Sequence, residues 1–267
     1  MLRHPVATGF YPEDEEELRK TVTKLLSFRA KKVKAKSIIV PHAGYLYSGE
    51  VAGATYASIE TDKRKILIAC PNHTGLGKQI ALSASDWQTP LGVVENAHEF
   101  VGEIPVSEEA HLYEHSLEVQ LPFLQVLFND FKLIPLSLSF VQFETLEELS
   151  EKLAKRDIFY IASSDFTHFG PNYNYTPFDV RDVKRALERV REIDFEAIKF
   201  IEKLDAKGFY HHVLENRLTI CGFVPITLIL LISKKLGAKR AKVVKYATSY
   251  EVTKDVNFVT YAGIVIY

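Results

Sequence analysis

Residues 158–170 read IFYIASSDFTHFG, and this stretch decides the fold class that the sequence predicts. An apolar run at 158–162 leads into polar residues, and His168 follows a few positions later. A short apolar run of this kind is typical of a strand that is buried on both faces of a sheet. Two more runs have the same form, at 37–40 and 65–70, and each ends at a proline. We therefore expect three buried strands that end in polar loops.

Helical patterns lie between and beyond these strands. Apolar residues at helical spacing predict helices at 15–28, 49–59, 114–128, 145–154, 181–204 and 222–236, and further strands are expected at 133–139, 243–248 and 258–267. Strands that alternate with helices predict an α/β fold, with a mostly parallel central sheet covered by helices on both faces. No repeat or low-complexity linker divides the sequence, so residues 1–267 are expected to form a single domain.

The composition is that of an ordinary globular protein, with 47% hydrophobic and 25% charged residues. The 33 basic and 34 acidic residues give a net charge of −1, which disfavours nucleic acid as a partner. The longest apolar stretch, 223–232, is too short to span a bilayer, and the acidic N-terminal segment does not resemble a signal peptide. The two cysteines, Cys70 and Cys221, provide no disulfide framework. We expect a cytoplasmic protein with no membrane partner.

Histidines follow all three apolar runs: His42, His73 and His168. In open α/β sheets, ligands bind beyond the carboxyl ends of the strands, where successive loops converge. If the three strands are neighbours, three imidazoles share one crevice with Asp165. One histidine in a turn is usually exposed or bonded to backbone, but three at equivalent strand ends favour a shared site. We expect the remaining loop histidines to be exposed or bonded to backbone: His4, His98, His211 and His212.

Two imidazoles and a third, anionic ligand can bind zinc, iron, copper or nickel and leave positions open for a substrate. The sequence leaves four candidates for the third ligand: Asp165, Glu114, Glu118 and Cys221. Cys221 directly precedes an apolar helical run, so a helix N-terminus and a metal would stabilise its thiolate. The alternative is that Cys221 is a small buried apolar residue, which is the interpretation we prefer for Cys70.

Two pairs of residues three positions apart could support the site. His115 and Glu118 would share one helical face, with Glu118 either beside the site or bonded to free backbone donors at the helix start. Asp165 and His168 lie in a tight turn, where the carboxylate could fix an imidazole tautomer for acid–base chemistry. The sequence lacks the G-x-S-x-G, G-x-G-x-x-G and H-E-x-x-H motifs of other enzyme classes.

Five segments taken together resemble the MEMO family (mediator of ErbB2-driven cell motility), in the order typical of that family. They are PHAGY (41–45), PNH (71–73), EHSLE (114–118), SSDFTH (163–168) and TICG (219–222). The resemblance covers essentially the whole chain. It implies a fold similar to the class III extradiol (LigB-like) dioxygenases, which hold non-haem Fe(II) with two histidines and a glutamate. Members similar to this chain carry a cysteine in the place of the glutamate.

The resemblance also implies roles for individual residues. His42, His73 and Cys221 would be the metal ligands, and His168 would act as the acid–base residue with Asp165 beside it. His115 would lie close to the ligands and support catalysis. Fe(II) is the expected metal, but a thiolate ligand also suits copper or zinc. The association of microbial members with radical-SAM and AMMECR-type proteins suggests a joint pathway.

The leading hypothesis for function is therefore a metal-dependent, dioxygenase-like oxidoreductase that acts on an unknown small molecule or peptide. One alternative is a non-catalytic adaptor that recognises a peptide through the remnant pocket. The rim of that pocket would be aromatic, formed by Tyr45, Tyr47, Phe166, Phe169 and Tyr173. A further alternative is a protein that binds and delivers copper or iron.

Overall fold

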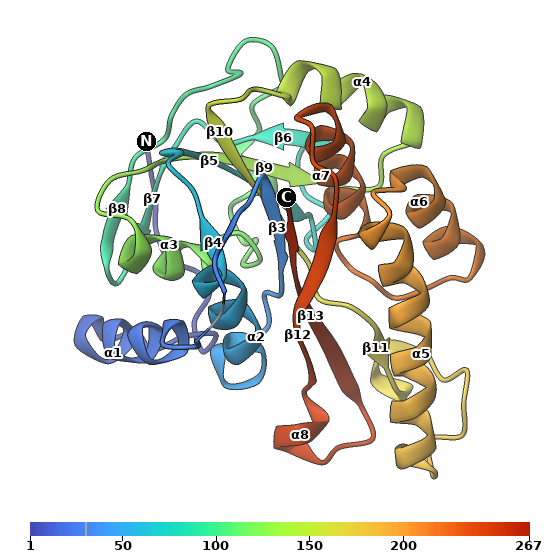
Figure 1. Cartoon of the computed structure of the whole chain (residues 1–267). Coiled ribbons are helices and arrows are strands. Elements are labelled where there is room, and N and C mark those ends of the chain that lie inside the picture. Colours follow the sequence, from blue (N-terminus) through green and yellow to red (C-terminus); the bar gives the residue numbers. More distant parts are fainter. Residues whose placement is uncertain (30) are drawn as a thin grey trace.

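The computed structural model describes residues 1–29 and 31–267, and an eight-stranded sheet lies at its centre (Figure 1). The strands of this sheet are β3 (Ser37–Val40), β5 (Lys65–Pro71), β6 (Ile80–Leu82), β9 (Lys132–Leu138), β10 (Ile158–Ser163), β11 (His168–Phe169), β12 (Ala241–Thr248) and β13 (Phe258–Ile266). Their order is β11-β13-β3-β10-β5-β9-β6, and β12 pairs with the free side of β13 along most of its length.

The middle of the sheet is parallel, as the sequence predicts. β10 lies between β3 and β5, and β5 also pairs with β9, all in parallel. Residues 66–71 and 158–163 are buried throughout, which explains why these strands read as continuous apolar runs instead of alternating patterns. The three strands that precede His42, His73 and the 163–168 loop are therefore direct neighbours.

The sheet as a whole is mixed, so the prediction of a mostly parallel sheet was wrong. β13 is antiparallel to β3, β11 and β12, and β6 is antiparallel to β9. Only residues 249–257 connect β12 to β13, and they contain the short helix α8 (Tyr250–Thr253). A parallel pair needs a crossover of a dozen or more residues, so a connection of this length produces antiparallel pairing.

Two small sheets and the helices complete the chain. The small sheets are β1 (Leu2–Arg3) with β7 (Asp86–Thr89) and β8 (Gly92–Val94), and β2 (Val33–Lys34) with β4 (Ile59–Glu60). The α-helices are α1 (Glu15–Leu26), α2 (Tyr45–Ala57), α3 (Leu121–Leu127), α4 (Phe143–Leu153), α5 (Val183–Glu202), α6 (Ala206–Glu215) and α7 (Phe223–Lys235). Short 3-10 helices lie at Glu108–Ala110, Glu118–Gln120 and Pro171–Tyr173. Among the described residues, no helix has both the length and the apolar character needed to cross a membrane.

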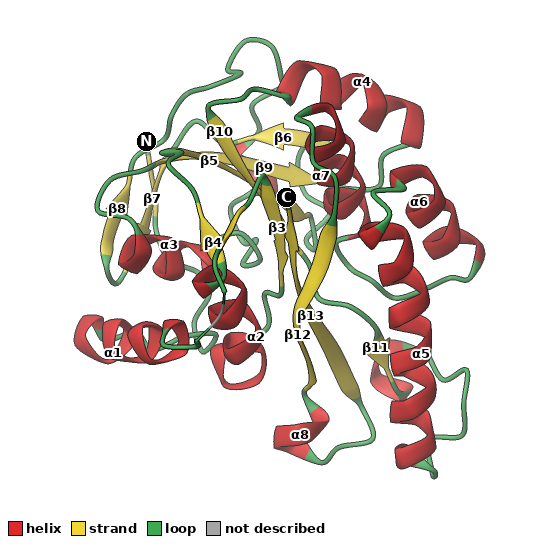
Figure 2. Ribbon diagram, in the orientation of Figure 1, coloured by secondary structure: helices red, strands yellow, loops and turns green. Residues whose placement is uncertain are grey.

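Helices cover both faces of the central sheet, as predicted (Figure 2). On one face, Leu67 and Ala69 of β5 pack in a cluster with residues of α4, α6 and α7. On the other face, Ile66 and Ile68 pack in a cluster with residues of α1, α2 and α3. Successive side chains of a strand point to opposite faces, so both clusters draw on the same strands.

Two helical predictions differ from the structure near functional residues. The helix expected at 114–128 begins only with the 3-10 turn at Glu118–Gln120 and continues as α3. Pro122 lies in the first turn of α3, where proline is tolerated, and residues 114–117 form turns that lead up to this start. Helix α6 (Ala206–Glu215) lies outside the helices that the sequence predicts. The Asp205 side chain caps this helix by accepting from the Gly208 backbone N–H.

Candidate metal centre

His42 directly follows Pro41 at the carboxyl end of β3, and only 2% of it is exposed. Its Nδ1 lies 3.0 Å from the Ser163 hydroxyl oxygen at the end of β10. That hydroxyl donates its own proton to the Ser116 carbonyl at 2.7 Å and accepts from the Gln120 amide at 2.9 Å. It therefore accepts from His42 Nδ1–H, and the lone pair of Nε2 is left for the site.

His73 follows β5, and its backbone and ring both form hydrogen bonds with the carboxylate of Glu114. The His73 backbone N–H donates to Glu114 at 2.6 Å, and Nδ1 lies 3.0 Å from the same carboxylate. Glu114 is fully buried and also accepts from the Ser116 backbone N–H and hydroxyl, at 2.9 and 2.7 Å. A carboxylate that takes one ring proton of a histidine leaves the other nitrogen free as a metal ligand.

Cys221 lies just before Gly222, the N-cap of α7. Its Sγ is 3.3 Å from Nε2 of His42 and 3.7 Å from the carbonyl oxygen of Asp165. Gly222 makes this approach possible. A Cβ at that position would come within 2.5 Å of the Ser164 Cβ and 2.6 Å of the Ser163 carbonyl oxygen. Only glycine lets the first turn of α7 lie so close to the end of β10.

The three predicted ligands meet at one place. His42, His73 and Cys221 each offer one ligand atom, and these three atoms lie within 4.8 Å of one another. Bonds of about 2.1 Å to nitrogen and about 2.3 Å to sulfur require ligand atoms roughly 3.5 Å apart in a tetrahedral site. The donor set and its spacing therefore fit a transition metal that accepts nitrogen and sulfur ligands.

Burial sets the ionisation of two of these ligands. It lowers the pKa of His42 well below its ordinary value, and the nearby imidazoles of His73 and His115 lower it further. It also raises the pKa of Cys221, so the surroundings by themselves favour the thiol. A metal ion replaces the thiol proton when it binds, because the thiolate is the ligand form.

His73 and Glu114 are a strongly coupled pair. Burial acts to lower the pKa of His73, but the Cys221 and Glu114 side chains beside it outweigh burial and raise this pKa to about 10. Burial likewise acts to raise the pKa of Glu114, but hydrogen bonds from His73 and Ser116 hold it at about 2. Glu114 therefore stays an ionised acceptor that fixes the orientation of the His73 ring.

His168 and Asp165 lie beside the ligands, with a geometry that differs from the expected one. The Nδ1 atom of His168 lies 3.0 Å from the carbonyl oxygens of both Phe166 and Thr219. Both are acceptors, so Nδ1 carries the proton and Nε2 is free. Asp165 is not the group that fixes this tautomer. Its carboxylate accepts from the backbone N–H groups of His42 at 2.8 Å and Ala43 at 3.3 Å, because β10 and β3 end side by side.

His115 lies against the ligand histidines. Its ring stacks on that of His73 with centroids 5.1 Å apart and meets that of His42 edge-on at 5.6 Å. The Phe10 ring of the N-terminal segment covers it at 4.3 Å. His73, Glu114 and His115 also form a second group of potential ligand atoms within 4.8 Å of one another. The structure thus places the His115 ring against both ligand histidines.

Glu118 anchors the N-terminal segment. It accepts from the Arg3 guanidinium at 2.6 Å, from the backbone N–H groups of Val6 and Ala7, and from the Tyr11 hydroxyl. The side chains of both Glu118 and Arg3 are at least 95% buried. Its hydrogen-bond partners in the described part of the chain all belong to residues 3–11, so Glu118 does not bond to the free backbone donors at the start of its own helix.

Comparison with known proteins matches residues 3–265 to the Memo-like protein family. This chain belongs to the MEMO family. A MEMO1 family protein of Aquifex aeolicus (strain VF5) is 39% identical over 99% of this chain and 98% of its own length. MEMO1 family proteins of Methanosarcina acetivorans and Archaeoglobus fulgidus are each 38% identical, over 99% of both chains. The family resemblance carried by the five segments is confirmed.

Sequence reasoning missed two residues that shape the site of this MEMO family chain. Ser163 and Gln120 fix the His42 tautomer, but neither stands at a spacing that signals chemistry. Glu114 was considered only as a direct ligand, whereas it bonds to the far side of the His73 ring. Cys70 is fully buried in the core, as predicted.

The aromatic rim predicted for the adaptor hypothesis is only partly present. Tyr45, Phe166 and Phe169 are buried in the core of this MEMO family chain. Tyr47 and Tyr173 are exposed, by 38% and 39%. The exposed aromatic surface near the site is therefore smaller than the sequence suggested.

Proposed function

We propose that this MEMO family protein is a metal-dependent redox protein on a scaffold like that of the class III extradiol dioxygenases, with non-haem Fe(II) as its metal. The observation that supports this most is the convergence of the His42, His73 and Cys221 ligand atoms within 4.8 Å. Both imidazoles have their Nδ1 protons held by other side chains. The Nε2 lone pair of His42 is therefore available, and that of His73 becomes available when a metal ion displaces its second ring proton. Three protein ligands leave coordination positions open for another molecule.

A ferrous ion, when bound, would supply Lewis-acid and redox chemistry at this place. The chain supplies the rest. His168 would hold or transfer a proton at Nε2, because two backbone carbonyls retain the proton on Nδ1. Asp165 holds the backbone that presents His42, and Glu114 orients His73. The proposed substrate is a small molecule or peptide whose hydroxyl group His168 deprotonates.

Metal content tests the proposal. The protein is purified without air, loaded with Fe(II), desalted and analysed for iron, copper and zinc. We expect one metal ion per chain in the wild type and little in His42→Ala or Cys221→Ser. The matched control is His211→Ala, which removes an exposed imidazole and should leave the metal content unchanged. Wild-type metal content in both site variants would overturn the proposal.

A second candidate function is recognition of a peptide by exposed side chains near the metal ligands. Three exposed tyrosines lie near the site residues in the sequence, and aromatic side chains are good anchors for partners. They are Tyr47, Tyr113 and Tyr173, with exposures of 38%, 64% and 39%. Capture of a defined peptide that persists after metal chelation would favour this function. Reversible metal exchange without turnover would instead favour metal delivery.

A further inference from the structure

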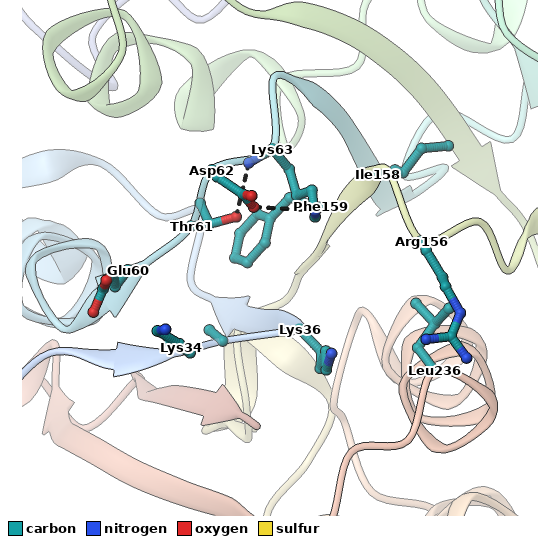
Figure 3. Close-up of a pocket in the computed structure, with 11 residues that line it drawn as sticks. Lys34, Lys36, Glu60, Thr61, Asp62, Lys63, Arg156, Ile158, Phe159 and Leu236 are labelled. Atoms are coloured by element: carbon teal, nitrogen blue, oxygen red, sulfur yellow. Dashed lines mark hydrogen bonds and ion pairs between the residues drawn. The ribbon is translucent and has the colours of Figure 1, made fainter.

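A recess lies at the edge of the sheet opposite to the metal centre (Figure 3). Its volume is about 460 Å³. Basic side chains that line it come from segments just before the parallel strands: Lys36 precedes β3, Lys63 precedes β5 and Arg156 precedes β10. The metal ligands His42 and His73 follow the other ends of these strands, so the two places share strands but no residues.

Positive charge is in excess around this recess. Besides Lys36, Lys63 and Arg156, the side chain of Lys34 in β2 also lines the recess, which gives four basic groups. Among the described residues, only two acidic side chains line it, those of Glu60 and Asp62. Asp62 is paired with Lys63 at 3.1 Å. The recess therefore has a surplus of two positive charges in a chain whose net charge is −1.

Three of these cations lack an acidic partner. Within residues 1–29 and 31–267, no carboxylate oxygen lies within 4.0 Å of the Lys34, Lys36 or Arg156 charged nitrogens. Glu60 is the register partner of Lys34 between β2 and β4, but in Figure 3 its carboxylate points away from the Phe159 ring. Unpaired cations grouped around a concave surface attract an anion more strongly than scattered surface lysines do.

The floor of the recess is apolar. Its accessible apolar surface comes from Ala35 and Leu236, which are partly exposed, and Ile158 and Phe159 also line the recess but are only 3% and 1% exposed. Figure 3 shows the Phe159 ring between Lys34 and Lys36 on one side and Asp62 and Lys63 on the other. A basic rim over an apolar floor suits a ligand that has both phosphate groups and a ring. Guanidinium and ammonium groups are the usual partners of phosphate. The size is typical of a pocket for a small molecule.

We propose that this recess binds a nucleoside diphosphate or a closely similar small organic diphosphate. The two phosphates would pair with Lys34, Lys36 and Arg156, and the heterocycle would cover the apolar floor. A nucleic acid strand fits the observations less well, because the chain as a whole is slightly acidic. The proposal is independent of the metal centre, since no residue is common to the two.

Calorimetric titration at about 0.15 M salt tests this proposal. The probes are ADP, GDP and inorganic pyrophosphate. We expect saturable binding of one molecule per chain, with the nucleotides tighter than pyrophosphate because only they cover the floor. The double variant Lys34→Ala/Lys36→Ala should bind about tenfold or more weakly, as expected when charged hydrogen bonds are lost. Arg156→Ala should weaken binding similarly, and Arg156→Lys should restore part of it.

A matched control separates the recess from general charge effects. Lys20→Ala/Lys152→Ala removes two exposed lysines from α1 and α4 and changes the net charge equally. This control should keep wild-type affinity, and thermal unfolding and metal content should be unchanged in all variants. Three outcomes would overturn the proposal: no saturable binding by the wild type, equal weakening by the control pair, or binding of a polynucleotide but not of the three small probes.

Discussion

The Sγ atom of Cys221 lies 3.3 Å from Nε2 of His42, although 179 positions separate the two residues in the sequence. This contact joins the start of α7 to the end of β3. It depends on Gly222, on the hydrogen bond between the Ser163 hydroxyl and Nδ1 of His42, and on the pairing of β3 with β10.

Gly222→Ala should displace Cys221 and destabilise the protein. The added Cβ would meet backbone and side-chain atoms of 163–164 at 2.5 to 2.6 Å, and overpacking of this kind costs about 1–3 kcal/mol. Fe(II) binding should weaken together with stability. Gly44→Ala is the matched control, because the nearest atom to its Cβ is 3.6 Å away. Urea unfolding and metal titration measure both effects, and equal behaviour of the two variants would contradict the close-approach argument.

Glu114→Gln should weaken Fe(II) binding by about 10- to 100-fold, as is usual when the partner of a ligand histidine is removed. The reason is that a neutral amide holds the His73 Nδ1–H less firmly than the carboxylate does. Metal titration without air measures the change. Glu108→Gln is the control, since Glu108 bonds to Ser83 and Ala84 instead of a histidine. Unchanged affinity in Glu114→Gln would show that the carboxylate does not position His73.

Arg3→Ala should reduce the free energy of unfolding by about 3–5 kcal/mol, because it leaves the Glu118 charge buried without its partner. Chemical denaturation measures this loss. Arg19→Ala is the matched control. Arg19 pairs with Glu15 one helical turn away, both side chains are at least half exposed, and the expected change is below about 0.5 kcal/mol. A small loss for Arg3→Ala would mean that the N-terminal segment contributes little to stability.

Asp194→Asn should make stability less dependent on pH. Burial raises the pKa of Asp194 above its ordinary value of 3.8, although hydroxyl groups of Thr167, Thr260 and Tyr246 oppose the shift. The native carboxyl group therefore keeps its proton to a higher pH than the unfolded one does. Its contribution to stability is fully present below pH 3.8 and is lost as pH rises through the native pKa.

The measurement for Asp194 is the free energy of unfolding from pH 4 upward. The difference between Asp194→Asn and wild type should shift in favour of the variant as pH rises, and it should level off once the native carboxyl group has ionised. Glu196→Gln removes an exposed carboxylate from the same helix and is the control for the change in net charge. A constant difference for Asp194→Asn would contradict a raised native pKa.

Much of the sheet could be predicted because its central strands are buried on both faces. The runs at 37–40, 65–70 and 158–162 agree closely with β3, β5 and β10. The direction of the antiparallel strands could not be predicted, because an apolar run does not indicate whether a strand pairs in parallel or antiparallel with its neighbour. The helix expected at 114–128 begins only at Glu118 in the structure. Its apolar spacing extends over residues 114–117, which form turns at the site instead of helix.

By itself, the sequence determined which residue types stand at the ends of the buried strands, because that pattern is local: an apolar run followed by a polar loop. It also determined the family, through five short segments in a fixed order. Only the tertiary structure decided which group fixes each imidazole. The partners of His42 and His73 lie 121 and 41 positions away, and strand order and turn geometry bring them into contact. The basic recess arises in the same way, from segments that are distant in the chain but adjacent at one edge of the sheet.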